Sequence, residues 1–201
     1  CRVIPNRGSW LDFEYDVKDF LYFKIDRKKK ILASTLLMAL GFTKSEIVEE
    51  FYESESYNLD SKTEKWKTKF NPENYKAKNF SEEVIDAKTG KVVIKLGDKI
   101  NFLNAKKLSN EGLKDILVSR ESLFGKFLHR DIKISDEEGG TFKIGTELND
   151  TIIKQITEAK INTIEVSITN SINKGPYLLN TILNDKNNNK DEAITEIYKM
   201  L

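Results

Sequence analysis

Residues 1–30 contain the side chains best suited to chemistry: a tryptophan close to a cluster of positive charge. Trp10 lies in a stretch of alternating polar and apolar residues, Arg7 lies shortly before it, and Arg27 and Lys28 open a basic run. An exposed indole offers an unpaired base a surface for stacking, at about 1–3 kcal/mol per base, while cations neutralise the phosphates. These residues predict a site for single-stranded nucleic acid.

The distribution of charge supports this location. The whole chain has 33 basic and 32 acidic groups, which excludes a general polycation. Residues 1–30 carry eight basic and five acidic groups, a net charge of +3, whereas the other 171 residues carry 25 and 27, a net charge of −2. The competing interpretation makes Trp10 a core residue with the lysines in solvent, and the residue types alone favour it.

A β-hairpin over residues 9–26 is expected to position these groups. SWLDFEY alternates polar and apolar residues, FLYFKID is rich in aromatic and branched residues, and the segment 16–19 between them has turn chemistry. With a turn there, paired positions sum to about 35, which puts Trp10 next to Ile25 and Asp26 at the open end.

Two helices are predicted over residues 31–53. ILASTLLMAL reads as the first helix, ended by Gly41. Thr43 is followed three residues later by Glu46, which is a capping box and begins the second helix.

An internal repeat with an offset of 48 residues follows. Asn101 aligns with Asn149 and Ile116 with Ile164. Each copy reads as a turn, a strand, a second turn at a glycine, a helix and a closing strand. We expect two ββαβ-like units, at about 88–119 and 136–168. In the first copy, the turns are expected at 88–90 and Gly97, the helix at 102–110 and the closing strand at 113–119. In the second copy, the turns are expected at 138–140 and Gly145, the helix at 150–159 and the closing strand at 161–168.

These elements predict an α+β fold in two parts. Residues 1–53 and 173–201 would form a small lobe of a β-hairpin and helices, and residues 54–172 would be an inserted α+β domain that contains the repeat. Trp66 in a lysine-rich strand of the insertion is expected to be a core residue, because alternation places the lysines on the other face.

Other kinds of site find little support. His129 is the only histidine and Cys1 the only cysteine, so disulfides and the usual zinc sites are excluded by count. No phosphate-binding glycine loop is present, and no apolar run is long enough to span a membrane. The hairpin carboxylates are best explained as a solvated face; they are Asp12, Glu14, Asp16 and Asp19.

The hairpin carries a resemblance to a known family. Residues 2–16 read R-V-I-P-N-R-G-S-W-L-D-F-E-Y-D and residues 25–30 read I-D-R-K-K-K. This resembles the β subunits of bacterial DNA-directed RNA polymerases, where the pattern is R-I-I-P-x-R-G-S-W-L-D/E-F-D/E-x-D followed by I-D-R-R/K-R/K-K. The G-P-Y turn at 175–177 and E-I-Y-K-M at 196–200 are similar to the same subunits further along. The resemblance implies the β lobe, with 54–172 as the external 1 domain inserted in it.

The resemblance also implies a function. In the family the lobe forms one wall of the DNA cleft near the downstream fork. The residues matching Trp10 and Asp26 help hold unpaired non-template bases, and those matching Arg27 and Lys28 lie close to the DNA. Many relatives have Arg where this chain has Lys28, which keeps the charge but loses a bidentate phosphate contact.

The resemblance further implies partners and a location. The parent complex is a nucleotidyltransferase whose Mg²⁺ is held by another subunit, so no cofactor and no catalysis are expected in this fragment itself. The partners would be DNA, the α, β′, ω and σ subunits, and accessory transcription factors on 54–172. No membrane contact is expected, and the location would be the bacterial cytoplasm, with the nucleoid. The start at Cys1 and the helical pattern still running at Leu201 suggest a piece of a longer protein.

Two alternatives remain open from the residues. The chain could be a stand-alone, non-enzymatic protein-interaction module in which the basic hairpin is only a solvated surface. It could also be a lipoyl- or biotinyl-like carrier domain, because 90–93 and 97–100 superficially follow that strand pattern. The carrier interpretation is weaker, since no Met-Lys-Met or Asp-Lys-Ala sequence is present.

Overall fold

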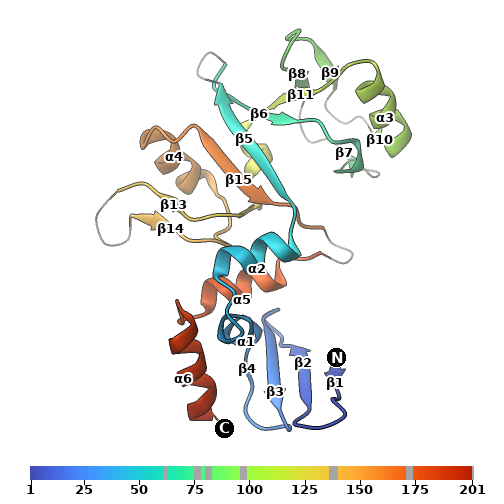
Figure 1. The fold of residues 1–201 in the computed structure, drawn as a ribbon. Coiled ribbons are helices and arrows are strands. Elements are labelled where there is room, and N and C mark those ends of the chain that lie inside the picture. Colours follow the sequence, from blue (N-terminus) through green and yellow to red (C-terminus); the bar gives the residue numbers. More distant parts are fainter. Residues whose placement is uncertain are drawn as a thin grey trace. The chain divides into compact units, whose positions relative to one another are not determined.

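The chain forms two compact units. The computed structural model describes residues 1–60, 63–74, 78–79, 83–95, 99–135, 140–170 and 174–200. Unit 1 consists of Cys1–Ser54, Phe127–Glu147 and Ser167–Leu201, and unit 2 of Glu55–Lys126 and Leu148–Val166 (Figure 1). Helices and antiparallel sheets occur together, so the predicted α+β class is confirmed.

Unit 1 contains a small antiparallel sheet with strand order β1-β2-β3-β4, and helices from both ends of the chain. Its elements are β1 (Arg2–Val3), β2 (Leu11–Tyr15), β3 (Leu21–Ile25), β4 (Ile31–Leu32), α1 (Ala33–Ala39), α2 (Lys44–Phe51), β12 (Phe127–Leu128), β13 (Ile132–Lys133), β14 (Thr141–Phe142), α5 (Tyr177–Asn184) and α6 (Lys190–Met200).

The predicted hairpin is confirmed as β2 and β3. Leu11 pairs with Ile25, so paired positions sum to 36, one more than expected. The carboxylate of Asp16 accepts the N–H groups of Lys18 and Phe20, at 2.8 and 3.2 Å, and Asp19 has a positive φ of 61°. This is a three-residue hairpin loop that ends in a left-handed residue, which is a common type of hairpin connection.

The predicted start of the first helix, at residue 31, is wrong. Residues 31–32 form β4 and pair with β3, where Ile31 lies opposite Phe23, and both side chains are buried. A branched residue facing an aromatic one is stabilised in a sheet, and this tertiary pairing outweighs local helix propensity. The helix α1 therefore begins only at Ala33.

The ends of α1 and α2 follow the predicted local chemistry. Gly41 has a φ of 109°; its N–H donates to Met38, and the N–H of Phe42 donates to Leu37, which is a Schellman motif. Thr43 and Glu46 form the predicted capping box, with hydrogen bonds of 3.2 and 2.7 Å in the two directions.

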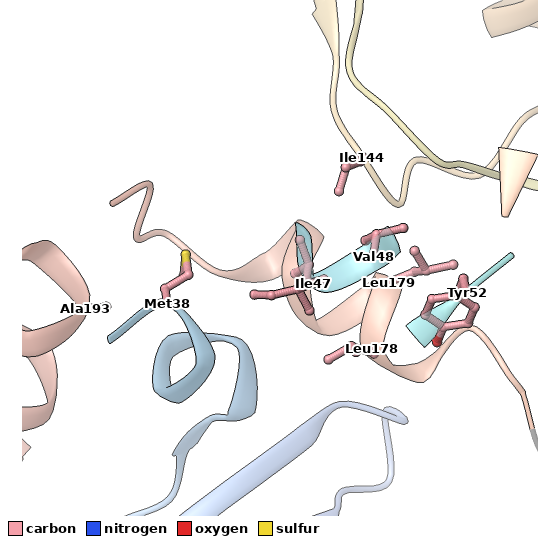
Figure 2. Close-up of a cluster of buried hydrophobic side chains, with 9 residues drawn as sticks. Met38, Ile47, Val48, Tyr52, Ile144, Leu178, Leu179 and Ala193 are labelled. Atoms are coloured by element: carbon pink, nitrogen blue, oxygen red, sulfur yellow. The ribbon is translucent and has the colours of Figure 1, made fainter. Parts of the chain in front are cut away.

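The core of unit 1 joins segments that are distant in the sequence. Figure 2 shows side chains of α2 and α5 packed together, with Ile144 extending toward Val48. The buried cluster consists of Met38, Ile47, Val48, Tyr52, Ile144, Leu178, Leu179, Ile182 and Ala193. The hairpin is attached to these helices by a hydrogen bond of 2.9 Å from the N–H of Leu21 to the hydroxyl of Thr181.

A buried polar network lies beside this core. The carboxylate of Asp185, which is 5% exposed, accepts hydrogen bonds from the hydroxyls of Ser34 and Thr35 on α1. It also accepts the backbone N–H and the side-chain amide of Asn187, at 2.9 and 3.0 Å. Lys44 donates to the Asp185 backbone oxygen at 2.9 Å, and burial lowers the pKa of its ammonium group. The network joins the first turns of α1 and α2 to the segment after α5.

Unit 2 is built on antiparallel strands in the order β15-β5-β6-β11-β8-β9. Its core includes Trp66, which is 1% exposed and lies between two exposed or half-buried lysines, as predicted. Its elements are β5 (Ser54–Asp60), β6 (Lys65–Lys69), the 3₁₀ helix η1 (Pro72–Asn74), β7 (Lys78–Asn79), β8 (Val84–Asp86), β9 (Val92–Ile94), β10 (Lys99–Ile100), α3 (Phe102–Asn110), β11 (Asp115–Val118), the 3₁₀ helix η2 (Arg120–Leu123), α4 (Asp150–Glu158) and β15 (Thr163–Ser167).

The two predicted copies of the repeat are alike in their helices and closing strands. Asn101 and Asn149 cap α3 and α4 in the same way, each accepting a backbone N–H at 2.9 Å, and β11 and β15 follow the helices. The preceding strands are not equivalent, because β9 pairs with β8 in unit 2 whereas β14 pairs with β13 in unit 1. Within the described residues, the two copies therefore match in their helices and closing strands and differ in the strands that precede them. The expected turns at Gly97 and at 138–139 lie outside the described residues.

The compact units also cross the expected domain boundaries. Residues 127–147 group with the lobe segments and not with the rest of 54–172, because Ile144 belongs to the core of unit 1. The extent of the insertion along the sequence thus stays a prediction. Among the described helices, none is both long and apolar enough to cross a membrane.

Candidate nucleic-acid interface

The open end of the hairpin closes in a tight turn that follows β3. The N–H of Lys28 donates to the carbonyl of Ile25 at 3.0 Å, and the two residues between them, Asp26 and Arg27, have positive φ angles of 47° and 60°. Consecutive left-handed residues other than glycine cost about 1–3 kcal/mol each and persist only where neighbouring contacts hold them. Such contacts are found at Asp26.

Asp26 holds the backbone of Trp10 by two hydrogen bonds. The carboxylate accepts the Trp10 N–H at 2.8 Å, and the Asp26 N–H donates to the Trp10 carbonyl at 3.0 Å. The hydrogen bond from Trp10 lowers the pKa of the Asp26 carboxyl, and a hydrogen bond from Ser9 and the charge of Lys28 lower it further. Asp26 is therefore ionised at neutral pH and keeps both Trp10 and the turn in place.

The side chain of Trp10 is exposed. It is 40% accessible, in contrast to the buried Trp66, so the interpretation of Trp10 as a core residue is wrong. Trp10 immediately precedes β2. An exposed indole on a fixed backbone is the arrangement that a stacking platform requires.

Positively charged residues lie in the segments next to this platform. Arg27 and Lys28 are exposed in the turn that holds Trp10, and Arg7 is exposed in the bend before it. Further along, the ammonium group of Lys30 lies 4.5 Å from the centre of the Tyr22 ring. The structure thus brings Trp10, Asp26, Arg27 and Lys28 together, and it places Arg7 in the connection between β1 and β2.

Two residues of the site were missed by sequence reasoning. Arg2 on β1 lies over the Trp10 ring, with its guanidinium carbon 5.4 Å from the ring centre, and the Ser9 side chain bonds to Asp26. The position of Arg2 depends on the pairing of β1 with β2, which no local sequence pattern predicts. Ser9 lies immediately before Trp10, and its hydroxyl beside a turn aspartate was a signal that could have been used.

Two of the four hairpin carboxylates form ion pairs. Asp12 pairs with Arg2, and Glu14 lies 2.7 Å from Lys24. No group of three or more potential metal-binding side chains occurs within the described parts of the chain. His129 is buried, with Nδ1 3.0 Å from the Ser167 hydroxyl, and so is an internal side chain.

Comparison with known proteins defines the class to which this fold and site belong. The family model described as RNA polymerase Rpb2, domain 2, matches residues 2–117, which include the hairpin, its turn and much of unit 2. The chain therefore belongs to this family, and the resemblance seen in the sequence is confirmed. The lipoyl- or biotinyl-like carrier interpretation is not supported.

Particular relatives carry the name DNA-directed RNA polymerase subunit beta. The chain is 41% identical over 201 residues to that of Rickettsia felis and 40% identical over 201 residues to that of Rickettsia conorii. It is 41% identical over 203 residues to that of Rickettsia canadensis. Each match covers 100% of this chain and 14% of the relative, so the chain spans about one seventh of the relatives' length.

Proposed function

We propose that the chain is the lobe segment of a DNA-directed RNA polymerase β subunit, and that Trp10 and its neighbours hold the unpaired non-template strand near the downstream fork. The family membership and the subunit names of its relatives support the parent complex. The observation that supports the site is the indole of Trp10, exposed to solvent while two hydrogen bonds to Asp26 fix its backbone.

The site residues have separate roles in this proposal. Trp10 stacks on an unpaired base, and Asp26 holds Trp10 and accepts hydrogen bonds from groups beside it. Arg27, Lys28 and Arg7 neutralise phosphates, which makes binding sensitive to salt. Because stacking needs no base-specific hydrogen bond, the platform accepts any base.

The rest of the complex completes the activity. Nucleotidyl transfer belongs to the assembled polymerase, and the Mg²⁺ it requires is held by another subunit, not by this segment. The partners are DNA and the α, β′, ω and σ subunits, with accessory transcription factors on 54–172. The complex works in the bacterial cytoplasm.

The stacking role is tested by Trp10→Ala in the full-length β subunit, assembled into polymerase. At a promoter, the open complex should lose about 5- to 150-fold in stability if one stacked base is lost, as measured by its dissociation rate in the presence of a competitor. Tyr15→Ala is the matched control, since Tyr15 is an exposed aromatic at the far end of β2, the strand that follows Trp10. An open complex that persists as long as the wild type would refute the site.

The charge role is tested by Lys28→Gln, compared with Lys18→Gln at the hairpin tip. Both residues are exposed lysines, so the two changes remove the same charge from opposite ends of the hairpin. Loss of one phosphate contact should reduce the slope of log K against log salt by about 0.7 for a single strand. Equal slopes for the two variants would contradict a phosphate contact at Lys28.

A further inference from the structure

The indole of Trp10 has two faces, and one of them lies against a cation of its own chain. Arg2 lies over the ring, with its guanidinium carbon 5.4 Å from the ring centre. A guanidinium within about 6 Å of the centroid is attracted by the ring, and a planar guanidinium can lie flat on it. Arg2 therefore occupies space that a nucleobase would otherwise take.

The cation is itself held in place. Arg2 is directly opposite Asp12 in the pairing of β1 with β2. Its Nε donates to one oxygen of the Asp12 carboxylate, and its Nη2 donates to the other at 3.1 Å. A two-pronged pair of this kind fixes the plane of the guanidinium as well as its position.

Both charges persist over the physiological range. The hydrogen bond between the two side chains raises the pKa of Arg2 and lowers the pKa of Asp12 from their ordinary values. The side chains are 39% and 17% exposed, so the pair lies at the surface of the sheet, beside the ring that it supports.

On the basis of the proposed function, we infer that Arg2 and Asp12 are positioning residues that cover one face of Trp10 and leave the other face for a single unpaired base. The order is then Asp12, Arg2, indole and base. Asp26 fixes the backbone of Trp10, and the pair formed by Arg2 and Asp12 fixes its ring. The ligand is one flipped-out nucleobase of a single strand, not two bases that enclose the ring.

The number of bases is tested with assembled polymerase on a forked DNA whose unpaired non-template strand carries 2-aminopurine at one position at a time. The fluorescence of this base analogue reports stacking. In Trp10→Ala, we expect the signal to change at one position only. A change at two adjacent positions would show that both faces are used and would overturn the inference.

The part played by Arg2 is tested on the same forks. Arg2→Ala should change the signal at the position that responds to Trp10→Ala, and it should weaken fork binding by about two- to fivefold, the range of an exposed cation–π contact. Arg2→Lys keeps the charge without the two-pronged pair and should give an intermediate result. Wild-type behaviour of Arg2→Lys would show that charge alone matters and would refute a positioning role.

The double variant separates this inference from the function on which it rests. If Arg2 acts through the ring, Arg2→Ala should add nothing to Trp10→Ala, whereas independent effects would be additive. No effect of Trp10→Ala would refute the proposed function itself. An effect of Trp10→Ala with none from Arg2→Ala, or additive losses, would refute only the role of Arg2.

A matched pair of variants on β2 controls for loss of a surface ion pair. Asp12→Asn disrupts the pair that holds Arg2, whereas Glu14→Gln disrupts the pair with Lys24 on the same hairpin. Asp12→Asn should weaken fork binding about twofold, and Glu14→Gln should not. Equal effects would indicate general loosening of the hairpin and would overturn the positioning role of Asp12.

Discussion

The backbone of Gly145 lies directly against the carbonyl group of Leu179. A Cβ atom at position 145 would lie 2.6 Å from that carbonyl oxygen, and Gly145 also has a φ of 81°, where other residues are strained. Gly145→Ala should therefore lower the free energy of unfolding by about 2–4 kcal/mol, because it adds overpacking to backbone strain. Urea denaturation followed by circular dichroism measures this loss.

Gly41 is the control for this prediction. It lies in the same unit and has a positive φ of 109°, but no atom lies within 4 Å of a Cβ built there. Gly41→Ala should show the strain alone, about 1–2 kcal/mol. A loss at Gly145 no larger than at Gly41 would mean that the contact with Leu179 is unimportant.

The two tryptophans should respond in opposite ways to truncation. Trp66 is 1% exposed and Trp10 is 40% exposed. Trp66→Ala should destabilise the chain by about 3–5 kcal/mol, as expected for a large core side chain, whereas Trp10→Ala should cost about 1 kcal/mol or less. Denaturant unfolding of both variants checks this difference. A large loss for Trp10→Ala would mean that its ring serves the fold and not a ligand.

Substitutions in the network around Asp185 should lower the free energy of unfolding more when they remove more hydrogen bonds. Asp185→Ala leaves buried hydroxyl and amide donors without their acceptor and should cost about 2–3 kcal/mol, whereas Ser34→Ala removes one donor and should cost about 1 kcal/mol. Glu50→Ala, at an exposed position of α2, is the surface control and should change the free energy of unfolding by less than about 0.5 kcal/mol. The order of the three unfolding free energies is the measurement, and any other order would contradict the network.

The contact between Asp26 and Trp10 should fail only in acid. Its hydrogen bonds lower the pKa of Asp26 below the ordinary value of 3.8. A lowered pKa means that the contribution to stability is complete above about pH 4 and is lost as the pH falls through the folded-state pKa. The chemical shift of the Trp10 amide proton should thus stay constant from pH 8 to about pH 4 and then change with a midpoint below 3.8.

Asp26→Asn provides the comparison for this titration. Asparagine tolerates a positive φ and keeps a side-chain oxygen that can accept the Trp10 N–H, but it does not titrate. The acid transition of the amide should disappear while the neutral-pH shift stays similar. A transition that persists in Asp26→Asn would assign it to another group.

Local chemistry was enough to predict much of the fold. Alternation and a turn at Asp16 predicted the hairpin, the Thr43 capping box predicted the start of α2, and the side chains of Asn101 and Asn149 mark the starts of α3 and α4. Each of these signals lies within a few residues of the feature that it produces. The exposed Trp10, in contrast, could not be distinguished from a core tryptophan by residue type.

What could not be predicted depends on contacts between distant residues. Residues 31–32 became a strand because Phe23 lies beside them, and residues 127–147 joined unit 1 because Ile144 reaches its core. The left-handed turn at Asp26 and Arg27 contains no glycine from which it could be predicted. The position of Arg2 over Trp10 follows from the pairing of β1 with β2.

The polar network of unit 1 also has a consequence for the order in which the chain folds during synthesis. Thr35 and its partner Asp185 are 150 residues apart along the chain. At about 5–20 residues per second, the first helices must wait on the order of ten seconds before the helix that completes their core has been translated. Unit 2 ends at Val166, so all of it is translated before α5, and the apolar surface of the first helices emerges before the segments that cover it.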